Sequence, residues 1–378
     1  MSKIYLPTAE QMEETLDNLN KIAIALGSTA DTSSWRGIQS VVRSGLAPEL
    51  FPIGTQFTVP HSKYGNIAFD VVAYDYFKSR GNENAHTMTL LSHDIIASVS
   101  FDVREAFYYA ENELPAGTYN FTLDADYSAW LAGTYQFTLT KALPKGGQLA
   151  LNGDSLVSLK SLSVVSHDNP NYYYPNVFET CAITEGSNGT NLGTFGVELN
   201  HVQRVGQGSN NYKESAIRQF LNSSSTAAAE WWYPKTKFDR PPNWVYTSDG
   251  FMRGLNDDFK EIIGKVNIPC IANNMYESPD STTSKGDKYV VTDKLYLASV
   301  GEISGQHTYE DNVVQFPYFE NGTSTDFMKY ENGVVNNWWT RTPNITGARS
   351  AYLIKNTGAV DFAYCTASHG LAIACTIA

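Results

Sequence analysis

The chain has 378 residues, of which 42% are hydrophobic, and a formal net charge of −12 at pH 7. This length is enough for a substantial core, either in one large domain with an appendage or in two domains. The acidic balance and the lack of a basic run argue against a nucleic acid or an anionic membrane as partner, because both require clustered Lys and Arg.

The cysteines and the first residues bear on the compartment. Cys181, Cys270, Cys365 and Cys375 are far apart, form no C-x-x-C pair and are too few for a disulfide scaffold, so we expect buried thiols. The opening MSKIYLPTAEQ lacks the apolar core of a signal peptide, and no apolar stretch reaches the roughly 20 residues that cross a bilayer. We therefore expect synthesis in a cytoplasm, without a signal peptide and without membrane insertion.

Residues 1–50 form a predicted N-terminal attachment segment dominated by one helix. The helix should span residues 8–26, because Thr8 and Gln11 have the spacing of a capping box and Gly27 follows the last apolar position. Its apolar residues keep a 4,3,4,3 spacing: Met12, Leu16, Leu19, Ala23 and Leu26. This seam is short for a coiled coil. It is predicted either to oligomerise or attach the chain, or to pack on its own domain.

Residues 51–378 are predicted to form the main domain, in which short strands dominate. Turn residues separate the strand-like segments: residues 56–59, 67–74 and 87–91. After them, residues 102–109 (DVREAFYY) place Val103, Ala106 and Phe107 on one side, which predicts a helix.

An internal repeat follows. AGTYNFTL at residues 116–123 returns as AGTYQFTL at residues 132–139, sixteen residues later. In both copies large apolar residues alternate with polar ones, which is the period of a half-buried strand. The repeat predicts a β-hairpin within a β-rich insertion at residues 113–165, which serves either as a spacer or as a binding module.

A second helix is expected at residues 213–221. Ile217 and Phe220 give it an apolar side, and Asn222 follows its last turn. We expect Arg218 to form a structural ion pair or a carbonyl contact. Further strand-like segments follow: residues 288–292 and 295–299.

The C-terminal segment, residues 336–378, has the composition of a binding surface. Apolar positions such as Trp339, Val360 and Gly370 alternate with Thr, Asn, Ser, Tyr, Asp and His. Binding loops favour these small polar and aromatic residues because they hydrogen-bond adaptably or stack rigidly. A catalytic site would instead need a few convergent titratable groups.

Motif order in this segment resembles a known family. An aromatic pair with W-T-R-T-P is followed by S-A-Y-L-I-K-N-T-G-A-V and a closing G-L-A-I-A-C-T-I. This order is similar to the C-terminal segment of C-type-lectin-fold domains in phage and bacterial surface proteins, including the variable proteins of diversity-generating retroelements. Upstream, Gly193-Thr194 and residues 208–223 and 238–255 resemble the core helix of that family and its connections.

The resemblance covers most of residues 51–378 and implies an α+β, C-type-lectin-like fold. Many relatives close with G-V-R-P-A, whereas here Gly370 is followed by L-A-I. A buried arginine of the family is therefore missing, which weakens the placement in a subfamily.

The resemblance also implies which residues would contact a ligand. In the family, the positions between fixed scaffold residues can be diversified by mutagenic copying of a template, because a rigid scaffold tolerates change in its loops. The matching positions are Trp338, Thr340, Thr342, Asn344, Thr346, Tyr352, Lys355, Asn356, Asp361, Phe362, Tyr364, Thr366, Ser368 and His369. The alternative is that these residues form the ordinary polar face of the final sheet.

Catalytic and metal-binding patterns are missing from the sequence. There is no G-x-S-x-G, G-x-G-x-x-G, Walker loop or H-E-x-x-H, and the seven histidines lack ligand spacing. His93 and its neighbour Asp94 should point to opposite faces of a strand. Close acidic pairs cannot alone supply the roughly six to eight oxygen ligands of calcium. We predict no catalytic residue, no metal site and no cofactor.

One class of enzyme shares the fold class that the resemblance implies. Formylglycine-generating enzymes use a closely spaced cysteine pair near the C-terminus. Cys365 and Cys375 are ten residues apart, and nothing near them in sequence would lower a thiol pKa. This class is the third hypothesis.

The leading hypothesis is a binding protein that is not an enzyme. The resemblance implies a phage tail or surface adhesin in a virion, with a binding surface that a retroelement can diversify. Its partner would be a protein or glycan receptor on a cell surface. The seam at residues 8–26 allows a homo-oligomer, and trimers are common among phage relatives. The alternative is a structural virion protein without an external ligand.

Overall fold

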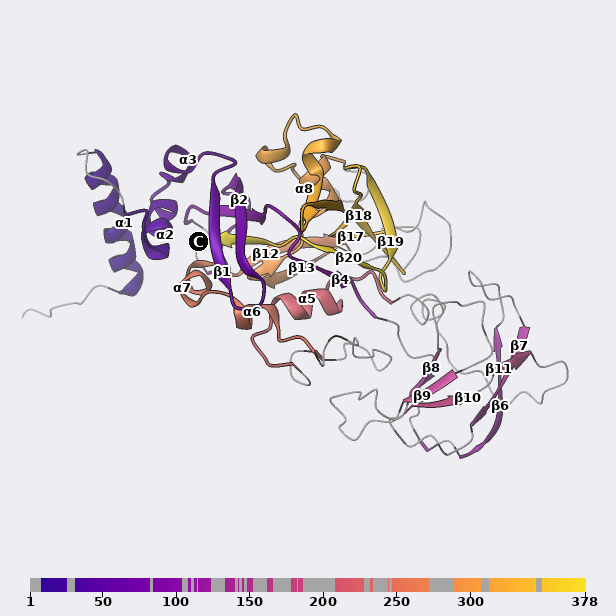
Figure 1. Ribbon diagram of the computed structural model, residues 1–378. Helices are drawn as coiled ribbons and strands as arrows, with labels where there is room; N and C mark the ends of the chain where they lie inside the picture. The colour runs from indigo at the N-terminus through magenta and orange to yellow at the C-terminus, as the bar shows by residue number, and fades with distance from the viewer. Residues whose placement is uncertain are drawn as a thin grey trace, which may run out of the picture.

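The computed structural model (Figure 1) describes residues 8–25, 31–81, 84–103, 208–227, 247–271, 288–306, 313–344 and 349–378, with shorter segments between residues 108 and 185 and around residues 232–244. The described chain is mostly sheet with few helices, and the fold class is α+β. Figure 1 shows a body of strands and helices, with the strands β6–β11 grouped apart from it. Within the described ranges, no helix has the length and apolarity needed to cross a membrane.

Apart from α1, the helices are short. They are α1 (Ala9–Ala25), α2 (Trp35–Arg43), α3 (Ala47–Leu50), α5 (Ala216–Leu221), α6 (Phe251–Gly254), α7 (Asp257–Ile262) and α8 (Val300–Ser304), with 3₁₀ turns η2 (Pro317–Phe319) and η3 (Ser324–Phe327). Ser34 caps α2, and its apolar positions Ile38, Val41 and Val42 are buried. Since α2 packs on the body, the N-terminal segment is not a separate unit from Trp35 onward.

The first sheet combines strands from distant parts of the chain. Its order is β1-β2-β3-β21-β14, and all neighbours are antiparallel. The strands are β1 (Gln56–His61), β2 (Gly65–Tyr74), β3 (Met88–Ser92), β14 (Leu295–Tyr296) and β21 (Ala374–Ile377). Because β21 lies between β3 and β14, residues 56–92 and 295–377 form one folding unit.

The second sheet contains most of the C-terminal segment. Its order is β19-β18-β17-β20-β4, and β17 and β20 run parallel. The strands are β4 (Ala97–Ser100), β17 (Trp338–Pro343), β18 (Ser350–Ile354), β19 (Val360–Tyr364) and β20 (Ser368–Leu371). Strand β17 therefore lies in the centre of the sheet and β19 at its edge.

The β-rich region between residues 108 and 185 forms two further sheets, with orders β10-β9-β8-β5 and β11-β7-β6. The strands are β5 (Tyr108–Tyr109), β6 (Gly117–Leu123), β7 (Gly133–Leu139), β8 (Gln148–Leu151), β9 (Leu162–Val165), β10 (Phe178–Cys181) and β11 (Ile183–Glu185). The two copies of the repeat are β6 and β7, which pair with Thr118 opposite Thr138. The predicted hairpin is confirmed, and the β-rich region extends beyond residues 113–165 because β5, β10 and β11 pair with its strands.

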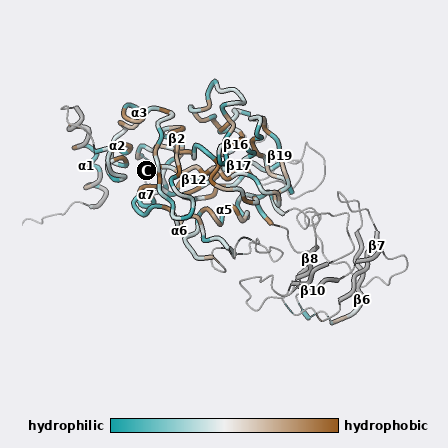
Figure 2. The backbone as a smooth tube through the Cα atoms, viewed as in Figure 1, coloured by the Kyte–Doolittle hydropathy of each residue, from teal (hydrophilic) through white to brown (hydrophobic). Residues whose placement is uncertain are grey.

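Two hairpins complete the described fold: β12 (Val266–Ile271) with β13 (Lys288–Asp293), and β15 (Lys329–Glu331) with β16 (Val334–Asn336). Figure 2 shows apolar segments concentrated around β12 and β17, with hydrophilic segments toward the outside. Phe69 on β2, Ile217 on α5 and Trp339 on β17 are fully buried members of one core. The core thus extends across both sheets.

A buried ion pair connects β17 to α8. Arg341 Nη1 and Nη2 donate to the two Glu302 carboxylate oxygens at 2.6 and 2.5 Å, and both side chains are fully buried. Arg341 Nη1 also donates to the Leu297 carbonyl oxygen, and Glu302 completes the capping box of Ser299. These additional bonds offset part of the cost of taking two charges out of water.

Several predicted elements are confirmed. The helix at residues 8–26 is α1, and its capping box is formed by Thr8 and Gln11, each of which accepts the backbone N–H of the other; Leu26 lies outside the described residues. The strands predicted at residues 56–59, 67–74, 87–91 and 288–292 are β1, β2, β3 and β13. The second helix begins at Ala216, later than predicted, because Ser215 caps it.

Two predicted elements differ from the structure. The prediction of a helix at residues 102–109 is wrong for Tyr108–Tyr109, which form strand β5. Residues 104–107 lie outside the described residues. Pairing of the two tyrosines with β8 overrides the helical pattern. The strand predicted at residues 295–299 ends at Tyr296, because Ser299 begins α8.

Candidate binding surface on the C-terminal sheet

The edge strand β19 displays aromatic side chains. Phe362 and Tyr364 are 51% and 45% exposed. Phe362 lies opposite Tyr352 of β18, and Tyr364 lies opposite Ser350. An edge strand has a strand neighbour on one side only, which leaves its side chains less covered than those of inner strands.

Tyr352, Phe362 and Tyr364 form what we call the edge aromatic row. The Tyr352 and Phe362 rings are 6.1 Å apart at 87°, a favourable edge-to-face arrangement. Tyr352 is buried, so it supports Phe362 and does not itself face solvent. The Arg349 guanidinium lies 5.0 Å from the Tyr364 ring centroid and adds a positive charge at the end of the row.

The β18–β19 turn is held by polar contacts. The Gly358 N–H donates to the Lys355 carbonyl oxygen at 2.8 Å, and the Lys355 ammonium lies 3.1 Å from the Asp361 carboxylate. Burial alone would raise the pKa of Asp361, but the Phe362 N–H and the Lys355 ammonium outweigh it and hold this pKa below its usual value. Asp361 therefore stays ionised beside the edge aromatic row, with its charge compensated by Lys355.

A groove of about 430 Å³ runs beside the edge aromatic row, within the size range of small-ligand sites. It is lined by the end of α8, by η3 and by the β18–β19 hairpin: Ser304, Gln306, Ser324, Phe327, Tyr352, Gly358, Ala359, Val360, Asp361 and Phe362. Aromatic rings, hydroxyl groups and one carboxylate therefore converge there. Such a lining can bind a ligand by stacking and hydrogen bonding.

Several of the predicted ligand contacts are buried instead, which is a correction to the sequence prediction: Trp338, Thr340, Thr342, Asn344 and Tyr352. Trp338 Nε1 donates to the Phe327 carbonyl oxygen, and the Thr340 hydroxyl donates to the Tyr352 carbonyl oxygen. Thr342 Oγ1 accepts the Val300 N–H at the start of α8. These side chains hold the sheet together because β17 is covered by strands on both sides and by η3 and α8.

The remaining predicted contacts are at least partly exposed: Lys355, Asn356, Asp361, Phe362, Tyr364, Thr366, Ser368 and His369; Thr346 lies outside the described residues. His369 is not on the face of Phe362. Gly370 pairs with Trp338, which shares a face with Val360 and Phe362, and His369 precedes Gly370. Its ring packs 4.9 Å from Trp339, and burial lowers its pKa. The predicted contacts thus do not form one continuous surface.

Sequence reasoning missed the far wall of the groove. Ser304, Gln306, Ser324 and Phe327 come from α8 and η3, distant in sequence from β19. Nothing in their local pattern marks them. Only the packing of α8 and η3 beside the second sheet brings them to the groove.

A separate polar cluster surrounds Asp70 on β2. Its carboxylate accepts hydrogen bonds from Gln56 (3.2 Å) and Tyr318 (3.4 Å) and lies 2.8 Å from His93 Nδ1. His93 therefore pairs with Asp70 on the neighbouring strand β2 and not with Asp94. This cluster ties η2, and His93 just after β3, to strand β2.

Within the described residues, no three His, Cys, Asp or Glu side chains are grouped closely enough to hold a metal ion. Cys270, Cys365 and Cys375 are buried and not in disulfides, as predicted; the Cys181 side chain lies outside the description. Burial raises the pKa of the Cys375 thiol, which opposes formation of a reactive thiolate.

Comparison with known proteins gives one match. Residues 187–378 match the family described as "Domain of unknown function (DUF6273)". No curated protein and no solved structure matches the chain. The matched region begins just after β11 and contains the second sheet except β4, together with β14 and β21 of the first. The chain belongs to the DUF6273 family.

Proposed function

We propose that this protein binds a protein or glycan receptor on a cell surface through the edge aromatic row and its groove. The observation that carries the proposal is the exposure of Phe362 and Tyr364 on an edge strand, where Phe362 also lines a groove of about 430 Å³. Aromatic side chains supply large, rigid contact area at low entropic cost, and binding hot spots are enriched in them.

We further propose that the body is a C-type-lectin-like fold of a phage tail or surface adhesin located in a virion. The support is the order of sequence motifs: W-T-R-T-P lies on β17, S-A-Y-L-I on β18 and A-C-T-I on β21. In this proposal β17 is the fixed scaffold and β19 is the surface that a retroelement can diversify.

The test uses arrays of glycans and of cell-surface proteins as probes for the full chain. The double variant Phe362→Ala/Tyr364→Ala should lose about tenfold or more in affinity for whatever the wild type binds. Val334→Ala is the matched control, because Val334 is 68% exposed and lies on β16, outside the groove lining. Equal affinity of the double variant and the wild type, or no binding to either array, would sink the proposal.

A structural role without an external ligand is the second candidate, because α1 has an exposed apolar stripe. Met12, Leu16, Leu19 and Ile22 are 57%, 62%, 58% and 54% exposed. Apolar residues on one helix side favour self-association, since each can bury its surface against another copy. This role could coexist with receptor binding or replace it.

Analytical ultracentrifugation tests the role of α1. A trimer or other oligomer should fall to a monomer in Leu16→Glu/Leu19→Glu. Val314→Glu, at a residue that is 69% exposed but outside α1, should leave the mass unchanged. A monomeric wild-type protein would remove this candidate.

A further inference from the structure

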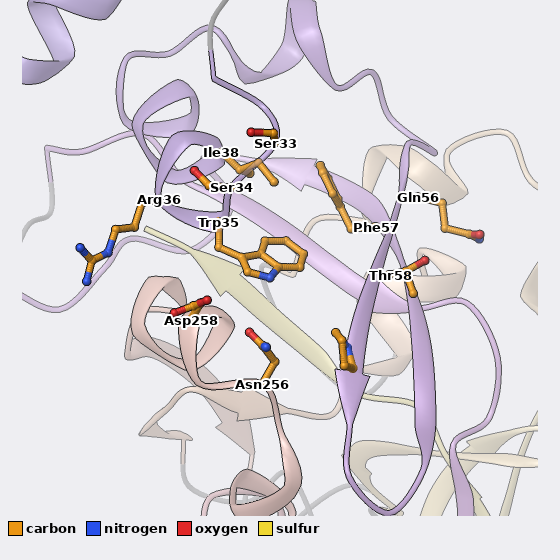
Figure 3. A pocket seen from close by; sticks show the side chains of 11 residues that line it. Ser33, Ser34, Trp35, Arg36, Ile38, Gln56, Phe57, Thr58, Asn256 and Asp258 are labelled. Atoms are coloured by element: carbon orange, nitrogen blue, oxygen red, sulfur yellow. The ribbon is translucent and has the colours of Figure 1, made fainter.

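A second depression lies at the other end of the body, between α2, β1 and α7. Its volume is about 880 Å³. It is lined by Ser33, Ser34, Trp35, Arg36, Ile38, Gln56, Phe57, Thr58, Pro60, Asn256 and Asp258. We call it the α2–α7 pocket (Figure 3). Figure 1 places α2 and α7 on the left of the body and β19 on its right, so the two sites are separate.

The centre of the pocket is a fixed aromatic surface. The Trp35 ring packs 4.8 Å from Phe259 and 6.0 Å from Phe57, at tilted or edge-to-face angles. Trp35 is only partly buried, so part of its indole faces the pocket. A ring held in place by two neighbours loses little entropy when a ligand stacks on it.

Polar groups surround this ring. Figure 3 shows Asn256 and the Asp258 carboxylate beside Trp35, with Arg36 turned away from the pocket. Asn256 Oδ1 accepts the Phe259 N–H at 2.9 Å, which leaves its amide N–H groups for another acceptor. The Trp35 indole N–H and the Thr58 hydroxyl make no hydrogen bond to any described residue. The pocket therefore offers three kinds of donor, an amide N–H, an indole N–H and a hydroxyl, together with the Asp258 carboxylate as acceptor.

The charges of the pocket select against an anion. Arg36 Nη2 donates to the Glu261 carboxylate at 2.9 Å, so its positive charge is already compensated. The Asp258 carboxylate would repel a second negative charge. The simplest other role of Asp258, stabilising the first turn of α7, accounts for the carboxylate but not for the Trp35 indole N–H, which no described residue accepts.

We propose that the α2–α7 pocket binds one ring of a neutral sugar. A sugar hydroxyl both donates and accepts, so it can satisfy the Asp258 carboxylate and the Asn256 or Trp35 N–H together. The apolar face of the sugar ring would stack on Trp35. This inference does not depend on the function proposed for the edge aromatic row.

Saturation-transfer NMR tests it with methyl glycosides of glucose, galactose, mannose and N-acetylglucosamine at millimolar concentration. At least one should receive saturation from the wild-type protein. Trp35→Phe keeps an aromatic ring against its neighbours but removes the N–H, and Asp258→Ala removes the acceptor. Each should weaken binding about fivefold, as expected for one lost hydrogen bond.

Val334→Ala is the control, because Val334 is 68% exposed and lines neither the pocket nor the groove, and it should bind the glycosides as the wild type does. Circular dichroism of each variant checks that it is folded. Absence of transfer to every glycoside, or equal transfer in Trp35→Phe and Asp258→Ala, would overturn the inference. Transfer that is lost only in Phe362→Ala/Tyr364→Ala would move the sugar to the edge aromatic row, and stronger binding of methyl glucuronide would contradict a neutral ligand.

Discussion

Strands β17 and β19 lie in the same sheet and share a mixture of aromatic, polar and charged residues, yet they have opposite roles. Every residue of β17 (WWTRTP) is buried, whereas Phe362 and Tyr364 of β19 (VDFAY) are exposed. The difference is position, because β17 has a strand on each side and β19 is at the edge. Polar and aromatic composition therefore does not by itself indicate a display surface.

The largest effect should come from breaking the Arg341–Glu302 pair under β17. Arg341→Met leaves the Glu302 carboxylate buried without its partner, which should lower the free energy of unfolding by about 3–5 kcal/mol. Urea denaturation measures this. Adding Glu302→Gln should restore part of the loss, because it removes the charge but can keep the capping bond to Ser299. A double variant that is less stable than Arg341→Met would show that the lone charge is not the cause.

Next in size is Gly358→Ala in the turn that positions β19. Gly358 has φ +75°, and an added Cβ would lie 1.6 Å from the Ser324 carbonyl oxygen. We expect a loss on the order of 3 kcal/mol from strain and clash together. Gly333→Ala is the matched control, with φ +81° and no atom within 4 Å of the Cβ, and it should cost roughly 1 kcal/mol. Equal losses would mean that packing against η3 does not hold the turn.

Lys329 gives a pH-dependent effect on the cover of β17. Its Nζ donates to the carbonyl oxygens of Ser92 and His93 and lies 5.4 Å from the Trp338 ring centroid. Burial lowers its pKa from 10.5 to about 8. Between these values the unfolded chain binds the proton and the folded protein does not, so this group's contribution makes stability rise with pH.

Relative to Lys329→Met, the wild type should therefore gain up to roughly 3 kcal/mol of unfolding free energy as the pH rises through this window. Denaturation of both proteins at several pH values between 7 and 10.5 measures the difference. Parallel profiles would contradict a depressed pKa for Lys329.

The smallest effect on stability should come from β19 itself. Phe362→Ala/Tyr364→Ala should change the free energy of unfolding by less than about 1 kcal/mol, because both side chains are about half exposed. Thermal and urea denaturation check this. A loss near that of Arg341→Met would make the edge aromatic row part of the core, contrary to a role in display.

Local signals in the sequence predict local structure well. The Thr8–Gln11 capping box, the alternation in the repeat and the Asn222 stop all correspond to observed elements. Helix α2 was not predicted, although Ser34 and the spacing of its apolar residues mark it.

Burial of β17 could not be predicted, because it depends on long-range pairing. Trp338 pairs with Gly370 and Ile354, and η3 and α8 cover Trp338 and Thr342. None of these neighbours follows from the local pattern. The predicted contacts on β17 are therefore wrong because they are buried, whereas those on β19 and in the turn are exposed and stay a prediction.

The most direct measurement is sequencing of the 3′ end of the gene across the population that carries it. Substitutions should exceed the average of the chain at Asn356, Phe362 and Tyr364, and fall below it at Trp338, Thr340 and Thr342. Substitution at the three β17 positions as often as at the exposed ones, or no excess at the exposed ones, would contradict the assignment of the binding surface to the edge of the sheet.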